Sequence, residues 1–220
     1  MGQKVNPISF RMGNLFTWSS RWFADKSTYY KYVHEDKRIR DFIQERLRMA
    51  GVVKVEIERS VNALKVRLYV SRPGVVIGRG GANLEQLKLD LAKLLKINPE
   101  DRKGQKIVID DIVEVQNPDT YAKLIVEKIN DQLLKRFPHR RAVLQAMDRA
   151  MTAGAKGIKI VLSGRIAGAE IGRREKYSKG KVPTQTLRAN IDYYEAPAKT
   201  KSGYVGIKVW VFKGEEPLLR

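Results

Sequence analysis

The feature that most constrains the fold is a glycine-rich turn between two apolar segments. The turn, residues 78–81, follows the apolar run 75–77 and precedes residues 82–95, in which one helical face is formed by Leu84, Leu87, Leu91 and Leu94. Glycines let a backbone approach a sugar-phosphate chain closely, and the start of the following helix offers free N–H groups and a positive dipole end. The sequence therefore predicts a phosphate-binding turn made of Gly78, Arg79, Gly80 and Gly81.

The elements around this turn predict an α+β domain over residues 36–116. Helical spacing predicts a helix over 36–50 that Gly51 caps, and alternation predicts a hairpin with strands at 53–57 and 64–70 and a turn at 60–62. A short helix precedes the turn, and a last strand is predicted at 106–115. In this αββααβ order the Gly-x-x-Gly turn resembles the loop of a type II KH domain, a fold that clamps about four single-stranded nucleotides.

The net charge indicates the same class of partner. The chain has 43 Lys and Arg against 24 Asp and Glu, a formal net charge of +19. A surplus of this size favours a polyanion such as nucleic acid. Because 43% of the 220 residues are hydrophobic, the chain can still bury a core, and its length predicts two modest domains.

Several kinds of catalytic site are excluded by composition and spacing. The chain has no cysteine, and its two histidines lie far apart in the sequence. Neither glycine-rich nucleotide-binding motif is complete. The carboxylates of Asp110, Asp111 and Glu114 could hold magnesium in a nuclease, but adjacent residues of a strand face opposite ways. We predict no enzyme, no metal and no cofactor.

Residues 117–214 predict a second α+β domain. A helix is expected from Asn117-Pro118 and a second one over 140–153. Strands predicted at 156–163, 186–194 and 204–212 complete an antiparallel sheet packed on these helices. Residues 1–35 are rich in aromatics and are predicted to be a docking segment, with 215–220 as a tail. No apolar run approaches a membrane span or a signal peptide, and a transit peptide in the acid-free residues 1–24 is the alternative.

Positive charge is densest in the last third of the chain. Residues 154–191 contain nine basic and two acidic side chains. Six of the nine lie in the stretch from Arg173 to Arg188 among glycine, proline and polar residues, a composition that predicts an exposed loop touching phosphate. With two cations of the N-terminal segment, the predicted RNA-phosphate contacts are Lys4, Arg11, Arg165, Arg173, Arg174, Lys176, Lys179, Lys181 and Arg188.

Motifs along nearly the whole chain resemble one family. They are Met1-Gly2-Gln3-Lys4-Val5-Asn6-Pro7 and the stretches 71–78, 157–160, 163–171, 182–183, 186–189, 191–193 and 206–214. In these segments the chain is similar to the bacterial family of ribosomal protein S-three, the third protein of the small subunit.

The resemblance implies a structural protein of the small-subunit head that binds small-subunit ribosomal RNA. It implies S-ten and S-fourteen as neighbours, and a position with S-four and S-five at the channel through which messenger RNA enters. Arg140 and Arg141 match the paired arginines of the family at that channel, where basic side chains hold single-stranded message. The implied location is the cytoplasmic ribosome, with an organellar ribosome as the alternative.

Two residues depart from the family pattern. Leu144 stands where members commonly have lysine, and Lys176 stands where many have tryptophan. The first makes the channel face less basic, and the second puts a stacking contact in doubt. Two other classes of protein remain as alternatives: a free-standing KH regulator of RNA, and a nuclease or lyase.

Overall fold

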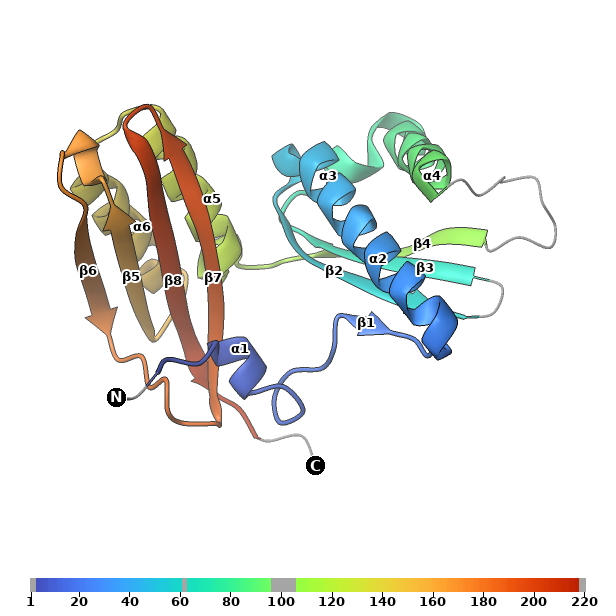
Figure 1. Cartoon of the computed structure of the whole chain (residues 1–220), viewed down its shortest axis with the longest axis horizontal. Coiled ribbons are helices and arrows are strands. Elements are labelled where there is room, and N and C mark those ends of the chain that lie inside the picture. Colours follow the sequence, from blue (N-terminus) through green and yellow to red (C-terminus); the bar gives the residue numbers. More distant parts are fainter. Residues whose placement is uncertain (1–2, 61–62, 96–105, 218–220) are drawn as a thin grey trace. The chain divides into compact units, whose positions relative to one another are not determined.

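The computed structural model describes residues 3–60, 63–95 and 106–217, without the side chains of Lys106 and Asp110. Met1 and Gly2 of the first motif, Val61 and Asn62 of the predicted turn, and the end of the tail, 218–220, lie outside the described residues. The chain divides into two compact units (Figure 1). We call Trp18–Gln116 the central unit, and Met1–Thr17 together with Asn117–Arg220 the terminal unit. The aromatic N-terminal segment is thus divided between the two.

The central unit has the predicted αββααβ order. Its sheet runs β1-β2-β3-β4, with the β2–β3 hairpin antiparallel and both outer pairs parallel. Helices α2 and α4 pack on this sheet through Ile39, Ile43, Leu87 and Leu91, which are buried against the strands. The elements are β1 (Ser20–Arg21), α2 (Lys26–Arg46), the 3-10 turn η1 (Arg48–Ala50), β2 (Val52–Arg59), β3 (Ala63–Val70), α3 (Pro73–Ile77), the 3-10 turn η2 (Arg79–Gly81), α4 (Ala82–Leu95) and β4 (Lys106–Glu114).

Helix α2 begins ten residues before the predicted start at Asp36, so the predicted boundary was wrong. Its first ten residues have no apolar period because this half of the helix does not pack on the core: Tyr29, Tyr30 and Val33 are exposed. At the other end, α2 stops at Arg46 and a 3-10 turn follows. Gly51 then takes a left-handed conformation with φ of 67°, which fits its predicted capping role.

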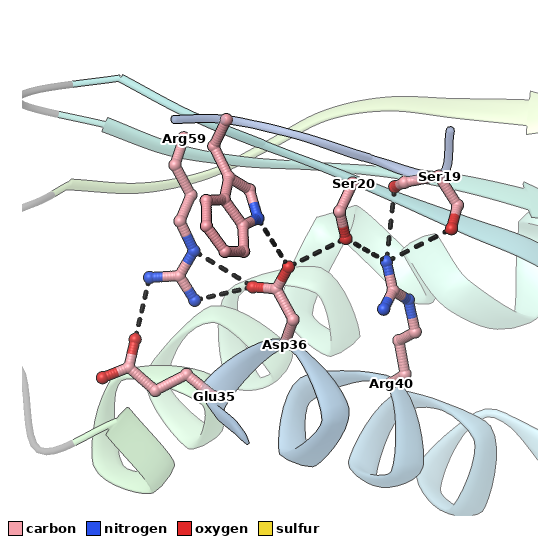
Figure 2. A network of polar contacts seen from close by, with 7 residues as sticks. Ser19, Ser20, Glu35, Asp36, Arg40 and Arg59 are labelled. Atoms are coloured by element: carbon pink, nitrogen blue, oxygen red, sulfur yellow. Dashed lines mark hydrogen bonds and ion pairs between the residues drawn. The ribbon is translucent and has the colours of Figure 1, made fainter. Parts of the chain in front are cut away.

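The short strand β1 is held by a buried carboxylate that the sequence did not reveal (Figure 2). Asp36 is 2% exposed, and its Oδ1 accepts hydrogen bonds from Nε and Nη2 of Arg59 at 3.0 and 2.7 Å. Its Oδ2 accepts from the Ser20 hydroxyl at 2.9 Å and from Trp22 Nε1 at 2.8 Å. Arg40 donates in turn to the Ser20 hydroxyl at 2.5 Å. One carboxylate therefore ties β1 to α2 and β2.

The terminal unit is a four-stranded antiparallel sheet in the order β6-β5-β8-β7, with α5 and α6 on one face. The core between helices and sheet includes Ile125, Ile129, Val143, Ile160 and Val209. Both predicted helices and all three predicted strands are present, which confirms the α+β class. The elements are α1 (Pro7–Phe10), the 3-10 turn η3 (Pro118–Thr120), α5 (Ala122–Leu134), α6 (His139–Thr152), β5 (Gly157–Gly164), the 3-10 turn η4 (Ile166–Gly168), β6 (Arg173–Gly180), β7 (Ala189–Thr200) and β8 (Gly203–Glu215).

Helix α5 starts at Ala122 rather than at the predicted Asn117-Pro118, because Pro118 opens a 3-10 turn and Tyr121 is extended. The N–H of Ala122 donates to Oδ2 of Asp192 on β7 at 2.8 Å. Burial raises the pKa of Asp192. The cap of α5 thus comes from a strand 70 residues away, which local spacing cannot indicate.

The first part of the loop predicted from Arg173 to Arg188 is a strand, and the rest, residues 181–188, connects two strands. Residues Arg173–Gly180 form β6, which pairs with β5 alone and lies at the edge of the sheet. Its basic, exposed side chains are typical of an edge strand, where charge prevents pairing with other chains. The predicted strand at 186–194 begins later, at Ala189, and continues to Thr200.

Candidate nucleic-acid interface

The glycine-rich turn of the central unit combines an open backbone with a helix start. Gly78, Gly80 and Gly81 have φ of 73°, 62° and 82°, a region that residues with a Cβ rarely adopt. Arg79 and Gly80 are exposed, and no atom lies within 4 Å of the place where a Cβ of Gly80 or Gly81 would stand. Helix α4 begins at the next residue, Ala82. The predicted turn residues are therefore together at a surface that phosphate can approach.

Gly78 is required by a close neighbour as well as by its φ. A Cβ at this position would lie 2.7 Å from the amide group of Asn83, whose Nδ2 donates to the carbonyl of Val75 at 3.3 Å. Asn83 thereby joins the first turn of α4 to the segment before the glycines. Beside the turn, Val75 and Ile77 are each 42% exposed. They offer apolar surface for bases next to a backbone suited to phosphate.

An open groove of about 920 Å³ lies along α6 in the terminal unit. Arg140 and Arg141, the predicted channel pair, are exposed and line it together with Arg149. The first turn of α6 contains no acid, and its N-cap, Pro138, supplies no side-chain hydrogen bond. Leu144 lines the same groove and is 52% exposed. The departure from the family pattern thus leaves an apolar patch on this face.

Both acidic residues of this groove are paired with lysines. Asp148 accepts from Lys179 of β6 at 2.7 Å, and Asp119 pairs with Lys128. Because both carboxylates are neutralised by lysines, the positive charge of the arginines in the groove is not offset. Lys179, a predicted phosphate contact, thus already forms an ion pair with a carboxylate of the same unit.

Glu175 ties β6 to the start of α6. The hydroxyl of Tyr177 donates to Oε2 of Glu175 at 2.5 Å, and Nε2 of His139 lies 3.0 Å from the same oxygen. Arg173, another predicted phosphate contact, donates to Oε1 at 2.8 Å. The bond from Tyr177 is the main reason that the pKa of Glu175 lies below its usual value, and Arg173 and His139 add to the effect. The carboxylate stays charged and holds these side chains in place.

Three predicted contacts gather on the sheet face opposite the helices. Lys4, Arg174 and Lys176 act together on Lys159 of β5, whose pKa is lowered first by burial and then by these three cations. Lys159 lies 4.8 Å from the ring centre of Trp210. We call these four basic residues the sheet-face cluster. Lys159 is one of the nine basic residues of 154–191 but is not among the predicted phosphate contacts; its alternation with Ile158 and Ile160 was the available signal.

The remaining predicted cations do not join this cluster. Arg165 follows β5, and its Nε donates to the carbonyl of Ala169 at 2.9 Å. Lys181 and Arg188 are exposed in the segment between β6 and β7. The set predicted from composition is therefore spread over both faces of the sheet and the loops at its ends.

Arg11 is not a surface residue, so its prediction as a phosphate contact was wrong. Its side chain is fully buried, and Nε donates to the carbonyl of Ala189 at 2.7 Å. Nη1 donates to the carbonyl of Pro7 at 2.9 Å, and Nη2 to those of Thr184 and Thr186 at 2.9 and 2.8 Å. Every nitrogen of the guanidinium is occupied by backbone. Arg11 fixes the segment before β7 to the N-terminal residues and cannot reach RNA.

The carboxylates considered for magnesium do not form a metal site in the described part of the chain. Asp111 pairs with Arg67 at 3.3 Å, and the side chain of Asp110 lies outside the described residues. The pairing of β3 with β4 shifts between Val66 and Leu68, so strict alternation fails at these aspartates. Among the described residues no three potential ligands gather, and no helix is long and apolar enough to cross a membrane.

Comparisons with known proteins give a family match for each of the two units. The KH domain family model matches residues 38–120, and the model of ribosomal protein S3, C-terminal domain, matches residues 129–211. The chain is 49% identical over 215 residues to small ribosomal subunit protein uS3 of Syntrophobacter fumaroxidans, covering 98% of this chain and 99% of that protein. It is 51% identical over 216 residues to uS3 of Clostridioides difficile, with 98% and 76% covered, and 49% identical over 215 residues to uS3 of Myxococcus xanthus, with 98% and 93% covered.

The sequence identity extends over both units. A free-standing KH regulator would not be expected to share the terminal unit. The matching proteins are components of the small ribosomal subunit by name, and neither family model describes an enzyme. From the whole-chain identity, the two domain matches and the αββααβ fold, we conclude that the chain belongs to the uS3 family of small ribosomal subunit proteins, which are structural components rather than enzymes.

Proposed function

We propose that this chain binds small-subunit ribosomal RNA in the head of the subunit and forms part of the channel through which messenger RNA enters. In this proposal S-ten and S-fourteen are its neighbours, and S-four and S-five complete the channel. The sheet-face cluster and the exposed cations Arg165, Lys181 and Arg188 neutralise ribosomal RNA phosphates. The turn at residues 78–81 contacts a single strand.

The observation that carries the channel assignment is the exposed pair Arg140 and Arg141 in the first turn of α6. Cations gain nothing from the dipole at a helix start and are mildly disfavoured there, so helix stability does not explain the pair. Both side chains line the open groove along α6, whose carboxylates are already paired. The phosphates of an incoming single strand can supply the negative charge that pairs with these arginines.

We expect Arg140→Ala with Arg141→Ala to slow translation past a stable messenger RNA hairpin by about fivefold. Two exposed charge contacts of roughly 0.5 kcal/mol each add about 1 kcal/mol to the barrier when they are lost. Ribosomes carrying the variant chain should assemble normally and read an unstructured message at nearly the normal rate. The measurement is single-ribosome or quench-flow translation on the two templates.

Leu144→Lys is the matched gain of charge on the same groove, and it should shorten the pause at the hairpin. Equal slowing on both templates by the double alanine variant, or failure of the subunit to assemble, would instead assign Arg140 and Arg141 to ribosomal RNA or to folding. No effect of Leu144→Lys would show that this face of α6 does not reach the message.

We expect Arg79→Asp with Gly80→Asp to weaken single-stranded RNA binding by the segment 18–116 about tenfold, because two carboxylates then stand where a phosphate would lie. This segment is the compact central unit, and starting at Trp18 keeps the Ser20 and Trp22 bonds to Asp36. Aspartate tolerates the positive φ of Gly80 better than most residues. Fluorescence anisotropy with a labelled RNA gives the affinity, and circular dichroism checks the fold.

Lys26→Asp with Ser27→Asp is the matched control, since it makes the same change of charge at two adjacent exposed residues in the first turn of α2. It should change RNA affinity much less than the turn variant. Equal losses in the two variants would mean that only net charge matters, and the turn would then have no specific role in binding.

A further inference from the structure

The terminal unit has a second cavity, of about 440 Å³. It plays no part in the roles proposed above for the glycine-rich turn and for the groove along α6. It lies at the end of α5, beside η4 and the β7–β8 turn. Its apolar lining is formed by Leu133, Leu134, Phe137, Leu162, Ile166 and Val205. This volume is in the range of small-molecule sites, which combine apolar walls with a few polar groups.

Four cations surround this apolar lining. Arg136, Arg165, Lys199 and Lys201 are exposed and line the cavity, and its described lining includes no Asp or Glu. Over residues 3–60, 63–95 and 106–217, no carboxylate forms an ion pair with any of the four. A cavity with these walls suits an anion that also has an apolar, planar part.

Two strained residues border the same cavity. Arg136 and Ala167 have φ of 59° and 57°, and among the described residues they are the ones other than glycine with positive φ. The N–H of Arg136 donates to the carbonyl of Leu133, and that of Phe137 donates to the carbonyl of Gln132, at 3.0 and 2.9 Å. This is the helix ending in which glycine is favoured at the position that Arg136 occupies. Strain of this kind gathers at binding sites, and here it falls on an arginine of the cavity lining.

We propose that this cavity holds one unstacked nucleotide of an RNA strand. The base lies on the apolar lining beside Phe137, and its phosphates lie among the four cations. Single-stranded RNA is commonly recognised through bases that leave the stack and contact aromatic side chains. The inference rests on the proposed function only in taking RNA as the polyanion; of the cavity residues, Arg165 alone was predicted from the sequence as a phosphate contact.

The test is photocrosslinking of the full chain to a 12-nucleotide uridine RNA that carries one 4-thiouridine. Mass spectrometry of the products should place crosslinks within residues 133–138, 165–168 or 199–205. Ser202→Trp fills the cavity without changing charge, and we expect it to lower this crosslink yield about tenfold, as loss of one stacked base would.

Arg136→Gly is the second variant, and unfolding does not confound it because glycine suits the helix ending at this position. It should melt at or above the wild-type temperature, yet crosslink about threefold less, roughly the loss of one charge contact. Lys135→Ala is its matched control, because it removes one charge from the adjacent exposed residue outside the cavity lining. The control should crosslink as the wild type does.

Three results would overturn the proposal in distinguishable ways. RNA binding with crosslinks only outside the three segments, or crosslinks within them that Ser202→Trp leaves unchanged, removes the cavity and leaves the proposed function standing. Failure of the full chain to bind the RNA at low salt overturns both. Binding of uridine 5′-monophosphate that Ser202→Trp abolishes, with RNA crosslinks elsewhere, assigns the cavity to free nucleotides and overturns the RNA assignment.

Discussion

Replacing Arg11 by methionine is expected to destabilise the terminal unit by about 3–5 kcal/mol, because four backbone carbonyls lose a charged donor at about 1 kcal/mol or more each. Methionine approximates the length and apolar stem of arginine but donates no hydrogen bond. The carbonyls of Pro7 and Ala189, whose bonds to Arg11 are buried, and those of Thr184 and Thr186, whose bonds are partly buried, would lose this donor. An unsatisfied buried group is costly. Arg11→Lys should recover only part of the loss, because one ammonium cannot reach acceptors arranged around a planar fork.

Urea unfolding followed by 19F NMR of 5-fluorotryptophan separates the two units. Trp210 is the tryptophan of the terminal unit, while Trp18 and Trp22 belong to the central unit. The Trp210 signal should shift its midpoint in the Arg11 variant, and the other two should not. Lys4→Met is the matched control, since Lys4 is exposed in the same segment and should cost less than about 0.5 kcal/mol. A loss below about 1 kcal/mol in Arg11→Met would contradict the structural role given to this residue.

Replacing Asp36 by asparagine is expected to destabilise the central unit by about 3–5 kcal/mol. The shape is kept but the charge is lost, so the Arg59 guanidinium, whose side chain is only 3% exposed, keeps Glu35 alone as a charged partner. An amide also presents one oxygen where the carboxylate presents two. It cannot accept from Arg59 on one side and from Ser20 and Trp22 on the other. Strand β1 should therefore loosen before the rest of the unit unfolds.

The 19F signal of Trp22 reports this change directly, because its indole N–H donates to Asp36. Asp41→Asn is the matched control: Asp41 lies on the same helix, pairs with Lys37 at an exposed position, and should cost less than about 0.5 kcal/mol. Asp36→Leu combined with Arg59→Met should recover much of the loss, since apolar replacement of a whole buried pair is often neutral. If Asp36→Asn were as stable as Asp41→Asn, β1 would be held by backbone pairing and not by this carboxylate.

Local sequence determined the order of the main elements and the position of the glycine-rich turn. The hairpin, α4, β4, α6 and the C-terminal strands follow from alternation or helical spacing, because each packs one continuous face on a core. The four residues of the turn follow from glycine chemistry, which acts over a few residues. The exposed start of α6 with Arg140 and Arg141 was likewise predictable, because Pro138 and the apolar period define that helix.

Only the tertiary structure decided how side chains distant in sequence meet. It buried Arg11 among carbonyls of the 183–189 segment, capped α5 with Asp192, and brought Lys159 into a cluster with Lys4. It also made residues 26–35 helical without an apolar period and residues 173–180 an edge strand rather than a loop. The physical reason is that periodicity records which face of an element is buried. Whether a cation meets solvent, a carboxylate or a set of carbonyls depends on other elements, which for Arg11 lie as far as 178 residues away and whose packing no local pattern encodes.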